Sequence, residues 1–284
     1  TYGRGFWILD DMAPLRQLGA AAAASQPILF APSPALRVHN NLNADTPFPP
    51  EVAHEPNPPA GAILYYYLPR PVQQLSISIL DAQGRSLLRT LRSSHDPELE
   101  AFQAAPQTVP DYWKQALHPL PTIAGMHRVV WDLRYPLPGQ PRLSLPMTAI
   151  DHDTAPSPRG PMVPPGRYLV QLTLDGQTFT QPLTVAPDPR AAPGSAAALA
   201  ALTTLQRQVL DALQAAAATT AAAATAPRAQ LLRLLNLLES PADATPTGAQ
   251  QATYLRACRE LKQVLAGANL RGSRDVCAMD KPSP

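Results

Sequence analysis

Charged side chains and cysteine are scarce in this chain of 284 residues. Charged residues make up 15% of the sequence, well below the usual quarter. The 23 Lys and Arg residues nearly balance the 21 Asp and Glu residues, which leaves a net charge of +2. So small a charge creates no strong field, and we expect neither nucleic acid nor an anionic lipid surface as a partner. No apolar run approaches the length of a membrane span.

The sequence also lacks the motifs of common catalytic sites. It contains no Gly-x-Ser-x-Gly, no His-Glu-x-x-His and no glycine-rich phosphate loop. Its two cysteines do not form a Cys-x-x-Cys pair, which excludes a zinc ribbon and a dithiol redox motif of that kind. We therefore predict no catalytic, cofactor-binding or metal-binding residue in this chain.

Proline is the residue in excess, and its distribution divides the chain. The 35 prolines are more than twice the usual share of about 5%, and no Gly-X-Y repeat accompanies them. Residues 1–60 and 101–190 are rich in proline, whereas the remainder after 191 is rich in alanine and leucine. Hydrophobic residues at 45% suffice for a core. We predict three regions, with boundaries at 1–60, 61–190 and 191–284.

The middle region has the alternating pattern of β-strands. Leu75, Ile77 and Ile79 alternate with serines, and Asp175-Gly176 between two alternating runs is a strong hairpin signal. Strands are expected at 63–68, 75–80, 86–91, 127–133, 167–174 and 177–185, without intervening helices. This order predicts an antiparallel, immunoglobulin-like β-sandwich. The side chains expected to point inward are Leu75, Ile77, Ile79, Val129, Trp131, Tyr168, Val170 and Leu172.

The last region reads as an antiparallel three-helix bundle, so the fold class is multidomain α+β. Apolar residues recur every three or four positions, and helices are expected near 195–216, 227–238 and 248–266. The first region reads as an extended, proline-rich wrapping segment, because proline interrupts both helices and strand ladders. A short helix at 13–24 is possible there, with Asp11 as its cap and Pro14 in its first turn.

Three acidic clusters are candidate sites. Asp10 and Asp11 follow a strand-like run and could serve acid–base chemistry or bind calcium, but a strand end and helix cap explain them more simply. The run 151–153, Asp-His-Asp, offers metal ligands without an identifiable distant partner. The run 95–98, His-Asp-Pro-Glu, is typical of a solvated turn that begins a helix.

Aromatic residues raise the question of sugar binding. Trp131-Asp132 with Arg134-Tyr135 could form a stacking platform, but alternation puts Trp131 on the same face as Val129, which favours a core position. The run 65–67 is three consecutive tyrosines, so at least one must point away from the core. We expect that one to pack against the proline-rich segment and not against a ligand.

Several segments resemble bacterial BNR-repeat, sortilin-like β-propeller proteins, which are often labelled glycosyl hydrolase or sialidase-like. The segment 1–11, Thr-Tyr-Gly-Arg-Gly-Phe-Trp-Ile-Leu-Asp-Asp, resembles the closing strand of their last blade, and 57–68 resembles the entry to their post-propeller sandwich. The segments 79–85, 125–135 and 165–168 resemble their FlgD-like immunoglobulin-type module. The aspartate-box pattern Ser-x-Asp-x-Gly-x-x-Trp is absent, so no sialidase residue can be transferred to this chain.

The resemblance implies a non-catalytic C-terminal region of a secreted or periplasmic propeller protein. Its partners would be the upstream propeller of the same protein and a protein or glycan ligand. Two alternatives stay open: a fragment of a glycoside hydrolase whose active site lies in the propeller, and a carbohydrate-binding module. The implied extracytoplasmic setting also favours a Cys258–Cys277 disulfide over a free, buried Cys258, and Gly267 and Gly272 would let the chain turn back.

Overall fold

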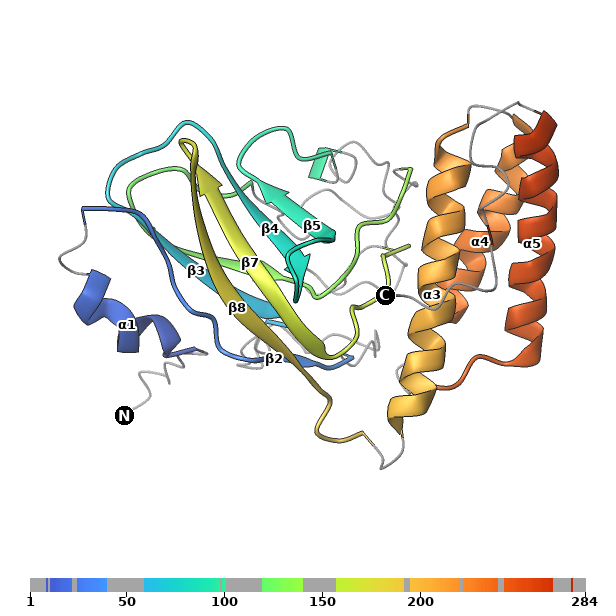
Figure 1. Cartoon of the computed structure of the whole chain (residues 1–284), viewed down its shortest axis with the longest axis horizontal. Helices are drawn as coiled ribbons and strands as arrows, with labels where there is room; N and C mark the ends of the chain where they lie inside the picture. The colour runs from blue at the N-terminus through green and yellow to red at the C-terminus, as the bar shows by residue number, and fades with distance from the viewer. Residues whose placement is uncertain are drawn as a thin grey trace, which may run out of the picture.

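The fold is mixed α+β, as predicted, with two β-sheets and four α-helices in the described part of the chain. This computed structural model describes residues 9, 11–21, 25–39, 59–97, 99–100, 119–139, 157–191, 195–219, 222–239, 243–267 and 277. The sheets occupy the middle of the molecule, between α1 (Ala13–Ala21) at one end and three long helices at the other (Figure 1). The predicted propeller strand before Leu9 lies outside the described residues.

The smaller sheet has three strands in the order β1-β3-β6. Its members are β1 (Ile28–Leu29), β3 (Ala62–Leu68) and β6 (Gly125–Trp131). Both pairings are antiparallel. Gly61, at the start of β3, has φ of +138°, and a Cβ built there would lie 2.1 Å from the carbonyl oxygen of Trp131. The close approach of the two strands therefore requires glycine at this position.

The larger sheet has five strands in the order β2-β8-β7-β4-β5. Its members are β2 (Ala35–Arg37), β4 (Leu75–Asp81), β5 (Leu87–Arg92), β7 (Gly166–Leu174) and β8 (Gln177–Pro187). The predicted alternation is confirmed: of the eight side chains expected to point inward, seven are buried and Val129 is half-buried. The hairpin at Asp175-Gly176 is also confirmed, with both residues at positive φ.

The proline-rich segment departs from expectation. It contributes β1 to one sheet and β2 to the other, because Ile28–Leu29 and Ala35–Arg37 fit between Pro27, Pro32 and Pro34. The prediction that proline interrupts every ladder is thus wrong for these short stretches. Strand β2 pairs with β8 in parallel, which also corrects the purely antiparallel arrangement. A parallel pairing is possible here because β2 and β8 are far apart in the sequence and are not joined by a hairpin turn.

One apolar cluster joins the two sheets. The three tyrosines of β3 show its orientation: Tyr66 lies in this main core and is fully buried, whereas Tyr65 faces the other way. Tyr65 packs with Phe30 of the proline-rich segment, beside Leu18 of α1. The expectation that an outward tyrosine would pack on that segment is confirmed.

Helices α3 (Ser195–Ala217), α4 (Thr225–Leu237) and α5 (Gly248–Gly267) contact one another and lie beside the sheets (Figure 1). The predicted apolar stripe of α3 is buried except for Leu199, which is half-buried. Gln206 is buried among these helices and donates a hydrogen bond to the carbonyl of Leu238 at the end of α4. Within the described ranges, no helix combines the length and the hydropathy that a bilayer crossing requires.

Helix α1 begins at Ala13, as the sequence indicates, and its described part runs to Ala21; the expected continuation over 22–24 lies outside the described residues. The Asp11 carboxylate accepts hydrogen bonds from the Ala13 backbone N–H at 2.9 Å and from the Ser33 hydroxyl at 2.8 Å. Asp11 therefore caps the helix start and ties it to the segment that follows. The Gln17 side chain adds two hydrogen bonds to the backbone of Ala31.

Candidate functional site

The turn after β6 is held by several hydrogen bonds and contains a residue at positive φ. Leu133 is fully buried and has φ of +59°, an uncommon conformation for a branched side chain. The Asp132 carboxylate accepts a hydrogen bond from the Arg134 N–H at 3.1 Å, and Trp131 Nε1 donates to the Arg134 carbonyl at 3.2 Å. The turn thereby fixes the direction of Arg134, which points away from the sheet core.

Trp131 is 1% exposed and meets the ring of Tyr168 edge-on, with centroids 6.1 Å apart. This confirms the core interpretation and leaves the indole unavailable as a sugar platform. The Trp131–Tyr135 motif has another role. Arg134 and Tyr135 reach the helices that lie beside the sheets.

Arg134 forms a buried ion pair with Glu239, the second residue after α4. Its other amino group donates to the carbonyl of Gly160 at 2.7 Å. Burial alone would raise the pKa of Glu239, but the hydrogen bond and charge of Arg134 oppose it, and so do the charges of Arg159 and His39. The result is a pKa of Glu239 below its usual value.

A second buried pair lies nearby. Arg37, the last residue of β2, is 2% exposed and pairs with Asp243 in the connection between α4 and α5. His39 Nε2 lies 3.0 Å from the other carboxylate oxygen of Asp243. Burial would raise the pKa of Asp243, whereas these two partners lower it, and the net pKa lies below the usual range.

Two further contacts join the segment after β6 to helices α3 and α4. The guanidinium of Arg207 on α3 donates to the Tyr135 hydroxyl at 2.8 Å and lies 4.8 Å from the centre of its ring. Arg228 of α4 donates to the carbonyl of Gly139. We call the site formed by Arg37, His39, Arg134, Tyr135, Arg207, Glu239 and Asp243 the joint. The joint holds the helices against the sheets. Both of its carboxylates are occupied by ion pairs with arginine.

The sequence singles out Arg134 and Tyr135, although for a stacking platform, but it does not indicate the other residues of the joint because their partners are far apart in the chain. Arg37 and Asp243 are separated by 206 residues. One signal was present: in a chain so poor in charge, Arg37 interrupts the apolar run Ala35-Leu36-Arg37-Val38. A charge in such a run indicates a buried partner.

The structure describes only part of the acidic clusters that the sequence offers as candidate sites. Asp11 is the helix cap described above, and Asp10, the run 151–153 and Glu98 lie outside the described residues. His95 is exposed, with an ion-pair distance of 3.9 Å to Glu100. Within the described ranges, no three His, Cys, Asp or Glu side chains gather as a metal site would require.

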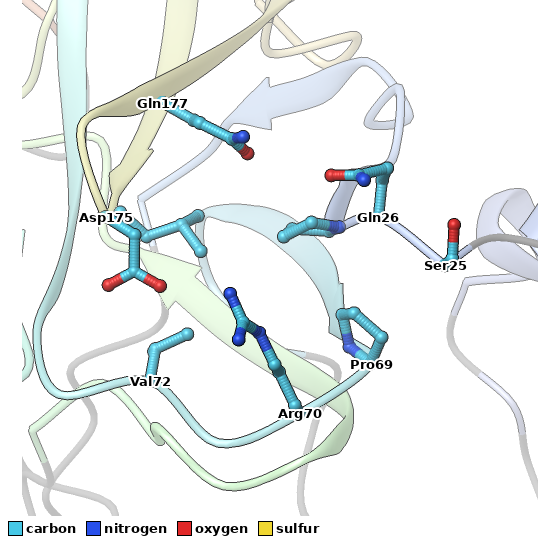
Figure 2. Close-up of a pocket in the computed structure, with 9 residues that line it drawn as sticks. Ser25, Gln26, Pro69, Arg70, Val72, Asp175 and Gln177 are labelled. Carbon is cyan, nitrogen blue, oxygen red and sulfur yellow. The ribbon is translucent and has the colours of Figure 1, made fainter.

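A surface pocket lies at the tip of the β7–β8 hairpin, beside the start of β1 (Figure 2). Arg70, Gln26 and Gln177 point toward its interior, and Asp175 and Ser25 lie at its rim (Figure 2). All five side chains are exposed. The lining is polar and open to solvent, and no hydrogen bond is observed between its Ser25 hydroxyl and its Asp175 carboxylate.

The two cysteines are bonded to each other in the structure. Cys258 lies on the buried face of α5, and its Cα is 5.9 Å from that of Cys277. The disulfide closes a separation of 19 residues and fixes Cys277 against the apolar cluster of the helices.

No family model, curated protein or solved structure matches this chain.

Proposed function

We propose that this chain is a non-catalytic structural and interaction region of a secreted or periplasmic β-propeller protein of the BNR-repeat, sortilin-like class. In this proposal the two sheets form the immunoglobulin-like sandwich and α3, α4 and α5 form the three-helix bundle. The chain would brace the last blade of the propeller and present its helices to a protein or glycan partner.

The observation that carries the proposal is a group of exposed apolar side chains at the start of α1. Leu9 and Met12, which precede the helix, and Leu15 in its first turn are 58%, 51% and 51% exposed, whereas Leu18 of the same helix packs in the cluster of Phe30 and Tyr65. Large apolar side chains that gather at an exposed surface indicate an interaction site. The segment 1–11, which leads into α1, is the one that resembles a propeller strand, so the propeller is the surface expected to cover these side chains.

The joint and the disulfide supply further support. The buried charges are used for packing, as in a structural region, and a disulfide that closes a tail suits an oxidising compartment.

The coding sequence upstream of Thr1 tests the proposal directly. We expect repeated Ser-x-Asp-x-Gly-x-x-Trp motifs there, and a sequence without them would contradict the assignment. The hydrolase alternative is tested by offering sialosides and other glycosides to the purified chain. We expect no turnover; turnover that is lost in an Asp11→Asn variant would favour an enzyme.

The role of α1 is tested with an apolar-surface dye. The chain should bind the dye, and Leu15→Glu should weaken that binding without lowering the urea midpoint. The matched control is Leu87→Glu, which alters a leucine of β5 that is 61% exposed and lies away from α1. Equal effects of the two substitutions would argue against a dedicated docking face.

A further inference from the structure

Two cations of the β part meet two carboxylates of a single connection. Glu239 and Asp243 both lie between the end of α4 and the start of α5. Arg37 comes from the edge of the five-stranded sheet, and Arg134 comes from the turn after β6. The connection is therefore held at two points that are close in sequence.

The two guanidinium groups are positioned by the β part itself. Arg37 Nε donates to the carbonyl of Val163 at 3.0 Å, and Arg134 Nη1 donates to that of Gly160 at 2.7 Å. Both acceptors belong to the segment before β7. The cations are thus oriented without help from the helices, and the helices supply only the counter-charges.

The rest of the joint is also polar. Across it, Arg207 contacts the Tyr135 ring and hydroxyl, and Arg228 bonds the Gly139 carbonyl. The main apolar cluster includes side chains of both parts, so separation would expose some apolar surface. No described strand is packed along the length of a helix (Figure 1). The ion pairs and side-chain hydrogen bonds across it are typical of the polar interfaces between domains of one chain.

We propose that the Arg37–Asp243 and Arg134–Glu239 pairs form an acid-released clamp, which lets helices α3, α4 and α5 undock from the sheets as a folded unit. A buried guanidinium that loses its counter-charge is strongly destabilising in that state. Undocking hydrates both cations, so protonation of the two carboxylates shifts the balance toward the open form.

The charged groups around the clamp set the direction of its pH dependence. Asp243 faces Arg37 and His39. Glu239 faces Arg134 and, at longer range, Arg159 and His39. The charge of Asp132 acts on Arg159, and Asp188 interacts with His39.

Both clamp carboxylates have pKa values lowered in the docked state. The two ionised carboxylates therefore contribute their full stabilisation of the docked state above about pH 4, the unperturbed pKa. This stabilisation is lost as the pH falls through the lower pKa values of the docked state. The clamp is therefore closed at neutral pH and opens in acid.

The experiment measures overall size and secondary structure separately. The double variant Glu239→Gln, Asp243→Asn keeps the shape of both side chains and removes their charge. At pH 7 we expect its radius of gyration by X-ray scattering to rise, while its circular dichroism stays that of the parent chain. Loss of a buried charge pair should lower the docked-to-open ratio by about 100-fold or more. The matched control is Asp175→Asn, which removes an exposed carboxylate at the tip of the β7–β8 hairpin, outside the joint, and should leave the size unchanged.

Acid titration of the unaltered chain provides the second measurement, which stands even if the double variant does not fold. We expect the radius of gyration to rise at a higher pH than the pH at which the circular dichroism changes. A double variant as compact as the parent chain would overturn the proposal. So would a parent chain that expands and loses its secondary structure in one transition, because the helices would then not be a separable unit.

Discussion

Replacement of Trp131 by alanine tests the centre of the β part. An aromatic side chain of this size buries roughly 200 Å², which at about 25 cal/mol per Å² corresponds to about 5 kcal/mol. Because the unfolded chain also shields part of that area, and large core truncations cost about 3–5 kcal/mol, we expect Trp131→Ala to lower the free energy of unfolding by about 3–5 kcal/mol.

The matched variant is Trp131→Phe, which keeps a buried ring but loses part of its area together with the hydrogen bond from Nε1 to the Arg134 carbonyl. Its expected cost is about 1–2 kcal/mol. Urea denaturation followed by circular dichroism gives both values, provided that the slope of the transition is unchanged. A loss below about 1 kcal/mol for Trp131→Ala would refute the reasoning and return the indole to the role of an exposed platform.

Three further predictions address the helices and the turn. Replacing Cys258 and Cys277 by alanine should lower the stability of the closing tail by about 3 kcal/mol, from the entropy of a loop of this length; thermal unfolding with and without reductant measures it, and equal midpoints would contradict it. Asp211→Asn should slightly stabilise the chain at pH 7 and not at pH 2, because burial raises the pKa of Asp211 in the fold and its ionisation above that value is unfavourable; urea midpoints at the two pH values decide. Gly160→Ala should destabilise by more than about 2 kcal/mol, since its Cβ would lie 1.8 Å from the Tyr135 carbonyl oxygen; a soluble variant with an unchanged urea midpoint would show that the turn can relax.

Much of the fold could be predicted because local patterns determine it. The alternation around Ile77 and the Asp175-Gly176 turn specify a strand and a hairpin within a few residues of sequence, and the leucine spacing specifies α4 and α5. Strands β1 and β2 could not be predicted, since two- and three-residue strands carry no period and depend on partners elsewhere in the chain.

The joint could not be predicted for a related reason. Whether Arg37 is a surface cation or a buried one depends on Asp243, and nothing near either residue indicates the other. Likewise Leu133 reads as an ordinary continuation of the β6 strand, while its positive φ is imposed by the hydrogen bonds of its neighbours. A local cluster such as Asp10 and Asp11 thus did not lead to the joint, whereas the single charge of Arg37 in an apolar run belongs to it.

The parallel pairing of β2 with β8 has a consequence for biosynthesis. Ala35 pairs with Val185, so strand β2 cannot form until 150 more residues have been translated, which takes roughly 8–30 s at 5–20 residues per second. Arg37 waits longer still, because its carboxylate partner is 206 residues away. Throughout that interval the nascent chain carries an uncommitted apolar segment, whose prolines at 27, 32 and 34 disfavour premature pairing with other strands. The same residues that limit these strands to two and three positions would keep the unfinished chain from aggregating on the ribosome.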